Sequence, residues 1–97
     1  MLEKDITNKI MKYLKTVPAC FAWKTHGGMY GTAGMPDIVC CIGGRFVGLE
    51  VKQPGKKLTA LQEDAINRIN AAGGIAAMVT SVGEVKEILM GMNDKSL

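Results

Sequence analysis

Residues 37–52, DIVCCIGGRFVGLEVK, determine the fold of this 97-residue chain. Two strand-like runs, 37–42 and 45–52, are separated only by Gly43-Gly44. Two glycines between such runs predict a two-residue hairpin turn of the primed type, whose backbone requires positive φ. We therefore predict an antiparallel hairpin in which Ile42 lies opposite Arg45.

The same pairing brings three charged side chains onto one face of the hairpin. Counted outward from the turn, Asp37 lies directly across from Glu50, and opposed Cβ atoms in such ladders are about 4.5–5.5 Å apart. Lys52 lies two residues beyond Glu50 and therefore shares its face. A bulge in either strand would shift this register.

Two carboxylates at this separation repel each other, and a divalent cation would offset the repulsion. Mg²⁺ takes one or two carboxylates, keeps several waters and leaves room for phosphate oxygens. A lysine beside the ion can stabilise charge on a phosphate or orient an attacking water. Asp37, Glu50 and Lys52 thus suit phosphodiester hydrolysis, with ordinary surface charges on a hairpin as the alternative interpretation.

Upstream of the hairpin, the pattern predicts one helix, one strand and a loop. Residues 3–16 have apolar side chains at helical spacing, and this helix must end before Pro18. Residues 20–24 are a short strand candidate. Residues 25–36, THGGMYGTAGMP, contain four glycines and a proline, which predicts a loop.

Downstream, a basic turn at 53–57 precedes a second helix, which Thr59 and Gln62 open with the form of a capping box. This helix stops at Gly73-Gly74, and residues 75–80 follow as a buried strand. A second capping box, Ser81 to Glu84, predicts a short last helix.

The expected order of elements is therefore α, β, β, β, α, β, α. A strand–helix–strand crossover after a hairpin predicts an α/β fold in which helices flank a mixed sheet.

Composition limits the class of protein. Ninety-seven residues, 47% of them apolar, predict one folded domain. No apolar run approaches the roughly 20 residues that span a bilayer, and the N-terminus lacks a secretory signal. The net charge of +3 permits a nucleic-acid partner without requiring one.

The three cysteines, Cys20, Cys40 and Cys41, have no C-x-x-C spacing. Cys40 and Cys41 point to opposite faces of a strand, so they cannot both bind one metal ion. An odd number of cysteines without an export signal predicts reduced, buried thiols in the cytoplasm.

Several of these motifs together resemble a known nuclease family. Gly34-Met-Pro-Asp37, the hairpin and Glu50-Val-Lys52 resemble the PD-(D/E)xK nuclease signature. The loop HGGMYGTAGMPD and the downstream LTALQ narrow the resemblance to the VRR-NUC group, the virus-type replication-repair nucleases, over nearly the whole chain. The resemblance implies a single nuclease domain over 1–97, with a restriction-endonuclease-like αβββαβ core.

The resemblance also implies roles for individual residues. Asp37 and Glu50, with the backbone carbonyl of Val51, would hold Mg²⁺, for which Mn²⁺ substitutes. Lys52 would position the attacking water or help to deprotonate it, and would stabilise the transition state.

Two more residues match the family pattern. Gln62 matches a glutamine at the active site, while its alternative role is the capping box. Glu3 matches an acidic residue in the first helix that supports the metal centre, and its alternative role is a favourable charge at a helix N-terminus.

The resemblance further implies a substrate and an assembly. Small stand-alone members of the group are similar to Holliday junction resolvases and form homodimers, which suits two symmetric nicks. We therefore expect a structure-selective endonuclease for four-way or other branched DNA, in the cytoplasm of a bacterial or phage-infected cell. A nickase or flap nuclease remains an alternative. Candidate contacts to DNA phosphates are Lys24, His26, Lys56 and Lys57, each of which could instead lie in a solvated turn.

Two other classes of function compete with the nuclease. One is a catalytically silent DNA-binding module, against which the opposed acids argue. The other is a Mg²⁺-dependent enzyme for nucleotides or other small phosphate esters. The sequence disfavours this enzyme because its few aromatic residues form no cluster for base stacking; they are Tyr13, Phe21, Trp23, Tyr30 and Phe46.

Overall fold

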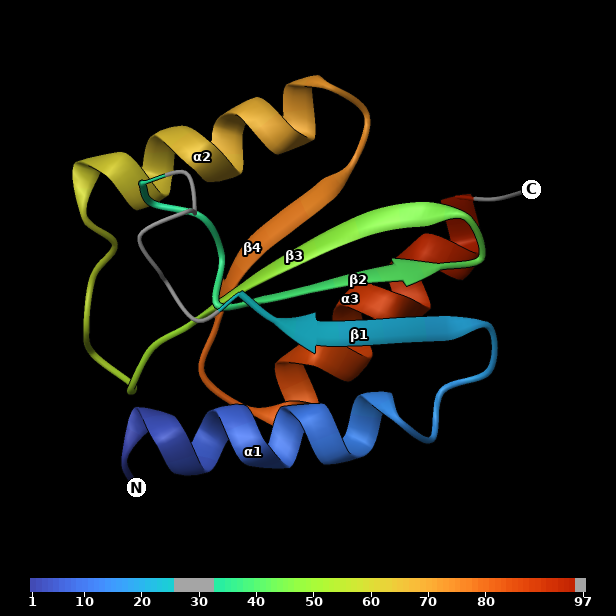
Figure 1. Ribbon diagram of the computed structural model, residues 1–97, viewed down its shortest axis with the longest axis horizontal. Coiled ribbons are helices and arrows are strands. Elements are labelled where there is room, and N and C mark those ends of the chain that lie inside the picture. Colours follow the sequence, from blue (N-terminus) through green and yellow to red (C-terminus); the bar gives the residue numbers. More distant parts are fainter. Residues whose placement is uncertain (26–32, 96–97) are drawn as a thin grey trace.

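The computed structural model describes residues 1–25 and 33–95. One sheet contains the four strands, in the order β1-β2-β3-β4 (Figure 1). Their bounds are β1 Cys20–Lys24, β2 Ile38–Ile42, β3 Arg45–Val51 and β4 Ile75–Val79. Strand β2 pairs antiparallel with both β1 and β3, and β4 pairs parallel with β3. The predicted mixed sheet is therefore confirmed.

Helices cover both faces of this sheet. Helices α1 (Glu3–Leu14) and α3 (Val82–Lys95) lie on one face, and α2 (Ala60–Ala71) lies on the other (Figure 1). The main core lies between the sheet and the α1–α3 face, because alternate residues of the strands point there. It includes Ile6, Ile10, Leu14, Ile38, Cys40, Val47, Leu49, Val51, Val79, Val85 and Leu89.

The hairpin has the predicted register. Ile42 pairs with Arg45, and the ladder continues without a bulge to Ile38 opposite Leu49. Gly43 and Gly44 have φ values of +57° and +84°, as a primed turn requires. The turn therefore fixes which β2 and β3 residues share a face.

The ends of two helices differ from the sequence predictions. Helix α1 ends at Leu14 rather than at residue 16, because Thr16 and Val17 donate tighter i→i−3 hydrogen bonds to Tyr13 and Leu14 before the proline. Helix α3 has 14 residues and is not the short helix that was predicted. Its buried side chains pack on the sheet and α1, and this tertiary packing extends the helix.

The second predicted capping box is only half formed. Ser81 Oγ accepts the backbone N–H of Glu84 at 3.2 Å, as expected. The Glu84 carboxylate, however, accepts from the backbone N–H and hydroxyl of Thr80 instead of returning to Ser81. These two hydrogen bonds lower the pKa of Glu84. The Glu84 side chain thus links the end of β4 to α3.

The cysteines are all free, but the prediction that all are buried holds only for Cys40, since Cys20 is partly buried and Cys41 is exposed. Cys40 is buried in the core and Cys41 is exposed on the other face, as their adjacency requires. Burial raises the pKa of the Cys40 thiol to about 12, so this thiol remains protonated. None of the helices within 1–25 and 33–95 is long and apolar enough to cross a membrane.

Candidate active site

Asp37 and Glu50 meet at the end of the sheet where β2 begins and β3 ends. The ladder's last pair is Ile38 with Leu49, so Asp37 and Glu50 hold the next opposed positions. The Asp37 carbonyl accepts the backbone N–H of Thr25 at 2.9 Å. Its Oδ2 accepts the backbone N–H of Val51 at 3.0 Å. The first bond fixes the Asp37 main chain beside the end of β1, and the second holds its carboxylate against β3.

Glu50 is a buried carboxylic acid with an unused oxygen. It is only 2% exposed, and its Oε2 accepts from Gln62 Nε2 at 3.1 Å. Its Oε1 is buried and has no hydrogen-bond partner among residues 1–25 and 33–95. A buried acceptor without a partner lowers the stability of the folded state, and such atoms commonly bind an ion or a water molecule.

The surroundings of Glu50 change its acidity. Burial raises its pKa most, and the neighbouring Asp37 carboxyl raises it further, to about 8. The positive charge of Lys52 acts in the opposite direction. Glu50 therefore retains its proton near neutral pH, until a cation or a higher pH removes it.

Gln62 joins the second helix to this pair, because it forms the predicted capping box and also contacts Glu50. Thr59 Oγ1 accepts the Gln62 backbone N–H at 3.2 Å, and Gln62 Oε1 accepts the Thr59 N–H at 2.9 Å. This capping box leaves the Gln62 NH₂ group free to donate to Glu50. The start of α2 thereby positions the Glu50 carboxylate.

Lys52 and Val51 continue β3 into the site. The Lys52 backbone N–H donates to the Val79 carbonyl at 3.0 Å, which extends the parallel pairing one residue beyond the strand. The alternation of side chains then places Lys52 on the Glu50 face. Val51 contributes its amide to Asp37 and lies between the two charged residues.

Glu3 belongs to α1, and no hydrogen bond joins its carboxylate to the acid pair among the described residues. It is exposed in the first turn of α1, and its charge contributes a small increase to the pKa of Glu50. Across the described part of the chain, no three His, Cys, Asp or Glu side chains gather into a metal-binding group. Glu3 acts on the acid pair through its charge, and its role as a support for the metal centre stays a prediction.

The lysines proposed as DNA contacts lie in different places. Lys24 Nζ donates to Asn8 of α1 at 2.9 Å, on the face of the sheet opposite the acids. Lys56 and Lys57 are exposed in the segment between β3 and α2. His26 falls outside the described residues.

Gly34 helps to shape the site, although the sequence identified it only as the start of the Gly34-Met-Pro-Asp37 motif and assigned it no role. Its φ is +82°, and a Cβ at this position would lie 2.3 Å from the Leu61 carbonyl oxygen. The backbone before Asp37 therefore packs directly on the first turn of α2, one residue from Gln62. The sequence signal was a glycine shortly before a Pro-Asp, but contact with α2 depends on tertiary structure.

Replacing Gly34 by Ala should destabilise the protein by roughly 2–4 kcal/mol, because left-handed strain and a backbone clash act together. Gly55→Ala is the matched control, since its φ is +87° but no atom lies within 4 Å of a Cβ there. It should cost only about 1 kcal/mol. Urea denaturation of both variants measures the difference, and equal losses would exclude the close approach at Gly34.

The structure corrects the prediction that the aromatic residues form no cluster. The rings of Phe21 and Trp23 on β1 are 5.5 Å apart, at an angle of 42°. Phe21 is 71% exposed and Trp23 is 43% exposed. Both are on the same strand at positions i and i+2, a spacing that places their side chains on the same face of the sheet.

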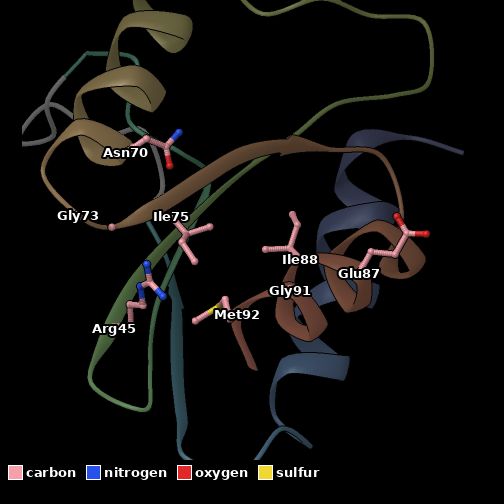
Figure 2. Close-up of a pocket in the computed structure, with 9 residues that line it drawn as sticks. Arg45, Asn70, Gly73, Ile75, Glu87, Ile88, Gly91 and Met92 are labelled. Carbon is pink, nitrogen blue, oxygen red and sulfur yellow. The ribbon is translucent and has the colours of Figure 1, made fainter. Parts of the chain in front are cut away.

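A separate hollow lies at the other end of the sheet. Its volume is 480 Å³, and it lies beside Arg45 and Ile75, where β3 and β4 begin (Figure 2). Glu50 is near the opposite end of β3. Asn70 at the rim is already occupied by two hydrogen bonds to the backbone of Ala76. This hollow is therefore distinct from the acid pair and has no comparable chemistry.

Comparison with known proteins relates this geometry to one fold. No family model matches the sequence, and no curated protein matches it. Two solved structures superpose closely. One, described as "VRR_NUC domain", has a TM-score of 0.75 and 19% identity, over 91% of this chain and 94% of its own. The other, "VRR_NUC domain protein", has a TM-score of 0.73 and 18% identity, over 93% and 86%. The chain therefore has the VRR-NUC fold, as its motifs predicted.

Proposed function

We propose that this protein is a metal-dependent endonuclease that hydrolyses DNA phosphodiester bonds, with Asp37, Glu50 and Lys52 as its active site. The observation that carries this proposal is the buried Glu50 Oε1, which has no partner in the described residues and lies beside a second carboxylate. A DNA-binding module without catalysis has no use for such a pair. The VRR-NUC fold supports the same conclusion.

The residues of the site fit a divalent cation. Asp37 and Glu50 offer hard carboxylate oxygens, and one of these is buried without a hydrogen bond. Together with the Val51 carbonyl they would hold Mg²⁺ or Mn²⁺. When bound, the ion neutralises the acid pair and polarises the phosphate.

The protein's own groups have separate tasks. Gln62 holds one oxygen of Glu50, so the other oxygen keeps a fixed direction. The Lys52 ammonium is a donor only, and it stabilises negative charge on a non-bridging phosphate oxygen or orients the attacking water. Hydrolysis forms a bond from the water oxygen to phosphorus and breaks the bond to a bridging oxygen. The water's protons end on that leaving oxygen and in solvent.

Branched DNA, including four-way junctions, is the substrate class that we propose, with a homodimer as the acting form. Lys56 and Lys57 supply positive charge in the exposed segment that leads from β3 to α2. Contacts of this kind read the backbone and not the bases. Affinity should therefore fall steeply as salt rises.

The test is incubation with Mg²⁺ or Mn²⁺ and a panel of linear, splayed, flap and four-way DNAs of shared sequence. We expect cleavage of a branched substrate that chelator stops. Asp37→Asn, purified in parallel, controls for contaminating nucleases. Cleavage that persists in this variant, or none on any substrate, would contradict the proposal.

Lys52→Ala should lower the cleavage rate by roughly 10²–10³-fold, the usual effect of removing one group that stabilises transition-state charge. The rates are best compared at several pH values, because the Lys52 charge lowers the pKa of Glu50 and its loss favours the protonated acid. Lys12→Ala, an exposed change on α1, is the control. Undiminished cleavage by Lys52→Ala would remove this residue from the mechanism.

A further inference from the structure

Phe21 and Trp23 form an exposed aromatic surface that the fold itself does not use. Both lie on β1, the outer strand, which pairs only with β2 among the described residues. Their rings contact each other, yet 71% of Phe21 and 43% of Trp23 remain exposed. Helix α2 lies over β3 and β4, and no helix of the described residues covers β1 on this face (Figure 1).

This aromatic pair shares its face with the acid pair. Trp23 pairs with Val39, and Phe21 pairs with Cys41. Asp37 is two residues from Val39 and therefore on the same face. Trp23 is thus the diagonal neighbour of Asp37, at about 7–8 Å, a distance that aromatic side chains bridge.

We propose that Phe21 and Trp23 stack on an unpaired nucleotide of the DNA, adjacent to the phosphate that is cut. The proposal rests on the proposed function, because a phosphodiester held at Asp37 and Glu50 fixes where the rest of the strand must lie. A stacked strand advances about 3.4 Å per nucleotide. The rings therefore lie within about two nucleotides of the site and favour substrates with unpaired bases beside the cut.

The size of the surface favours a base over a second copy of the chain. A buried aromatic side chain contributes about 150–250 Å², so these two partly exposed rings offer at most a few hundred. A stable protein interface buries about 800 Å² on each partner. A single base is instead matched by one or two rings, and stacking tolerates any sequence.

Trp23 is the only tryptophan in the chain, so its fluorescence reports directly on this surface. The protein is titrated, in chelator to prevent cleavage, with an oligo-dT strand and with a duplex of the same length. We expect saturable quenching that is stronger with the single strand. Phe21→Ala should weaken single-strand binding by roughly tenfold. Met90→Ala, an exposed apolar change on α3 at the other face, should not.

Binding without a divalent cation separates this inference from the nuclease proposal. Quenching in a protein that cuts no DNA would contradict the nuclease and retain the stacking surface. Cleavage without quenching, or equal losses in Phe21→Ala and Met90→Ala, would overturn the stacking surface alone. Light scattering of wild type and Phe21→Ser, both without DNA, tests whether the rings contact a second copy of the chain instead. If wild type is a dimer and Phe21→Ser is a monomer, the rings form a dimer interface and the stacking proposal is overturned.

Discussion

Asp37→Asn is expected to reduce cleavage by about 10³-fold or more while leaving the metal-free protein as stable as wild type or more stable. An amide is a poor ligand for Mg²⁺, and the bound ion supplies several kcal/mol of transition-state stabilisation, at about 1.4 kcal/mol per tenfold in rate. The fold should not suffer, because the Asn carbonyl can still accept the Val51 N–H that now bonds Asp37 at 3.0 Å.

The gain in metal-free stability has a separate cause. Asp37 is one of the groups that raise the pKa of Glu50, so its charge opposes the ionisation of Glu50. Opposed pairs of this kind change stability by roughly 0.2–1 kcal/mol. Removing the Asp37 charge relieves this cost, and the NH₂ group of the new asparagine can donate to Glu50.

Thermal melts of wild type and Asp37→Asn, in chelator and in Mg²⁺, measure both effects. Wild type should gain stability with Mg²⁺ by mass action, and the variant should gain much less. A clear loss of stability for the variant in chelator would mean that the Asp37 charge supports the fold. An unchanged response to Mg²⁺ would place the ion elsewhere.

The metal-free protein is expected to lose stability as pH rises from about 4.5 to about 8, and Glu50→Gln should remove most of this loss. The pKa of Glu50 is raised from 4.5 to about 8 in the folded state, mainly by burial and then by Asp37. The folded state therefore binds the proton more tightly than the unfolded state does. The stabilisation from this bound proton is fully present below pH 4.5 and is lost as pH rises through the folded-state pKa of Glu50.

The magnitude follows from the same pKa difference. Each unit corresponds to about 1.4 kcal/mol, so the ionisation of Glu50 costs a few kcal/mol by pH 9. Glu50→Gln keeps the side chain's shape and can still accept from Gln62. The variant should therefore be more stable than wild type above pH 8 and nearly equal to it at pH 4.5.

Urea denaturation in chelator, at pH values from 5 to 9, provides the measurement. Glu63→Gln, an exposed change in the first turn of α2, is the control for loss of a carboxylate and should follow wild type. A Glu50→Gln protein with the wild-type slope would show that Glu50 is ionised at neutral pH. In wild type, Mg²⁺ should restore stability most strongly at high pH, because the ion and the proton compete for Glu50.

Much of this protein was determined by local sequence. Two glycines readily adopt the positive φ of a two-residue primed turn, and with strand-like runs on both sides Gly43-Gly44 fixed the pairing of β2 with β3. The two-residue period of a strand then placed Asp37 opposite Glu50. Thr59 and Gln62 likewise specified the start of α2 through hydrogen bonds three residues apart. Such features depend on neighbours in the chain, which is why the sequence predicts them.

Other properties depend on residues that are distant in sequence. Glu50 has a buried, unpartnered oxygen and a raised pKa only because the folded chain excludes water and brings Gln62 against it. The approach of Gly34 to Leu61 likewise requires α2 to pack over the loop. The exposure of Phe21 and Trp23 follows from how far α2 extends across the sheet. Local patterns thus placed the charged residues, but burial, desolvation and the uncovered aromatic face arise only from tertiary packing, because they depend on which surfaces exclude water.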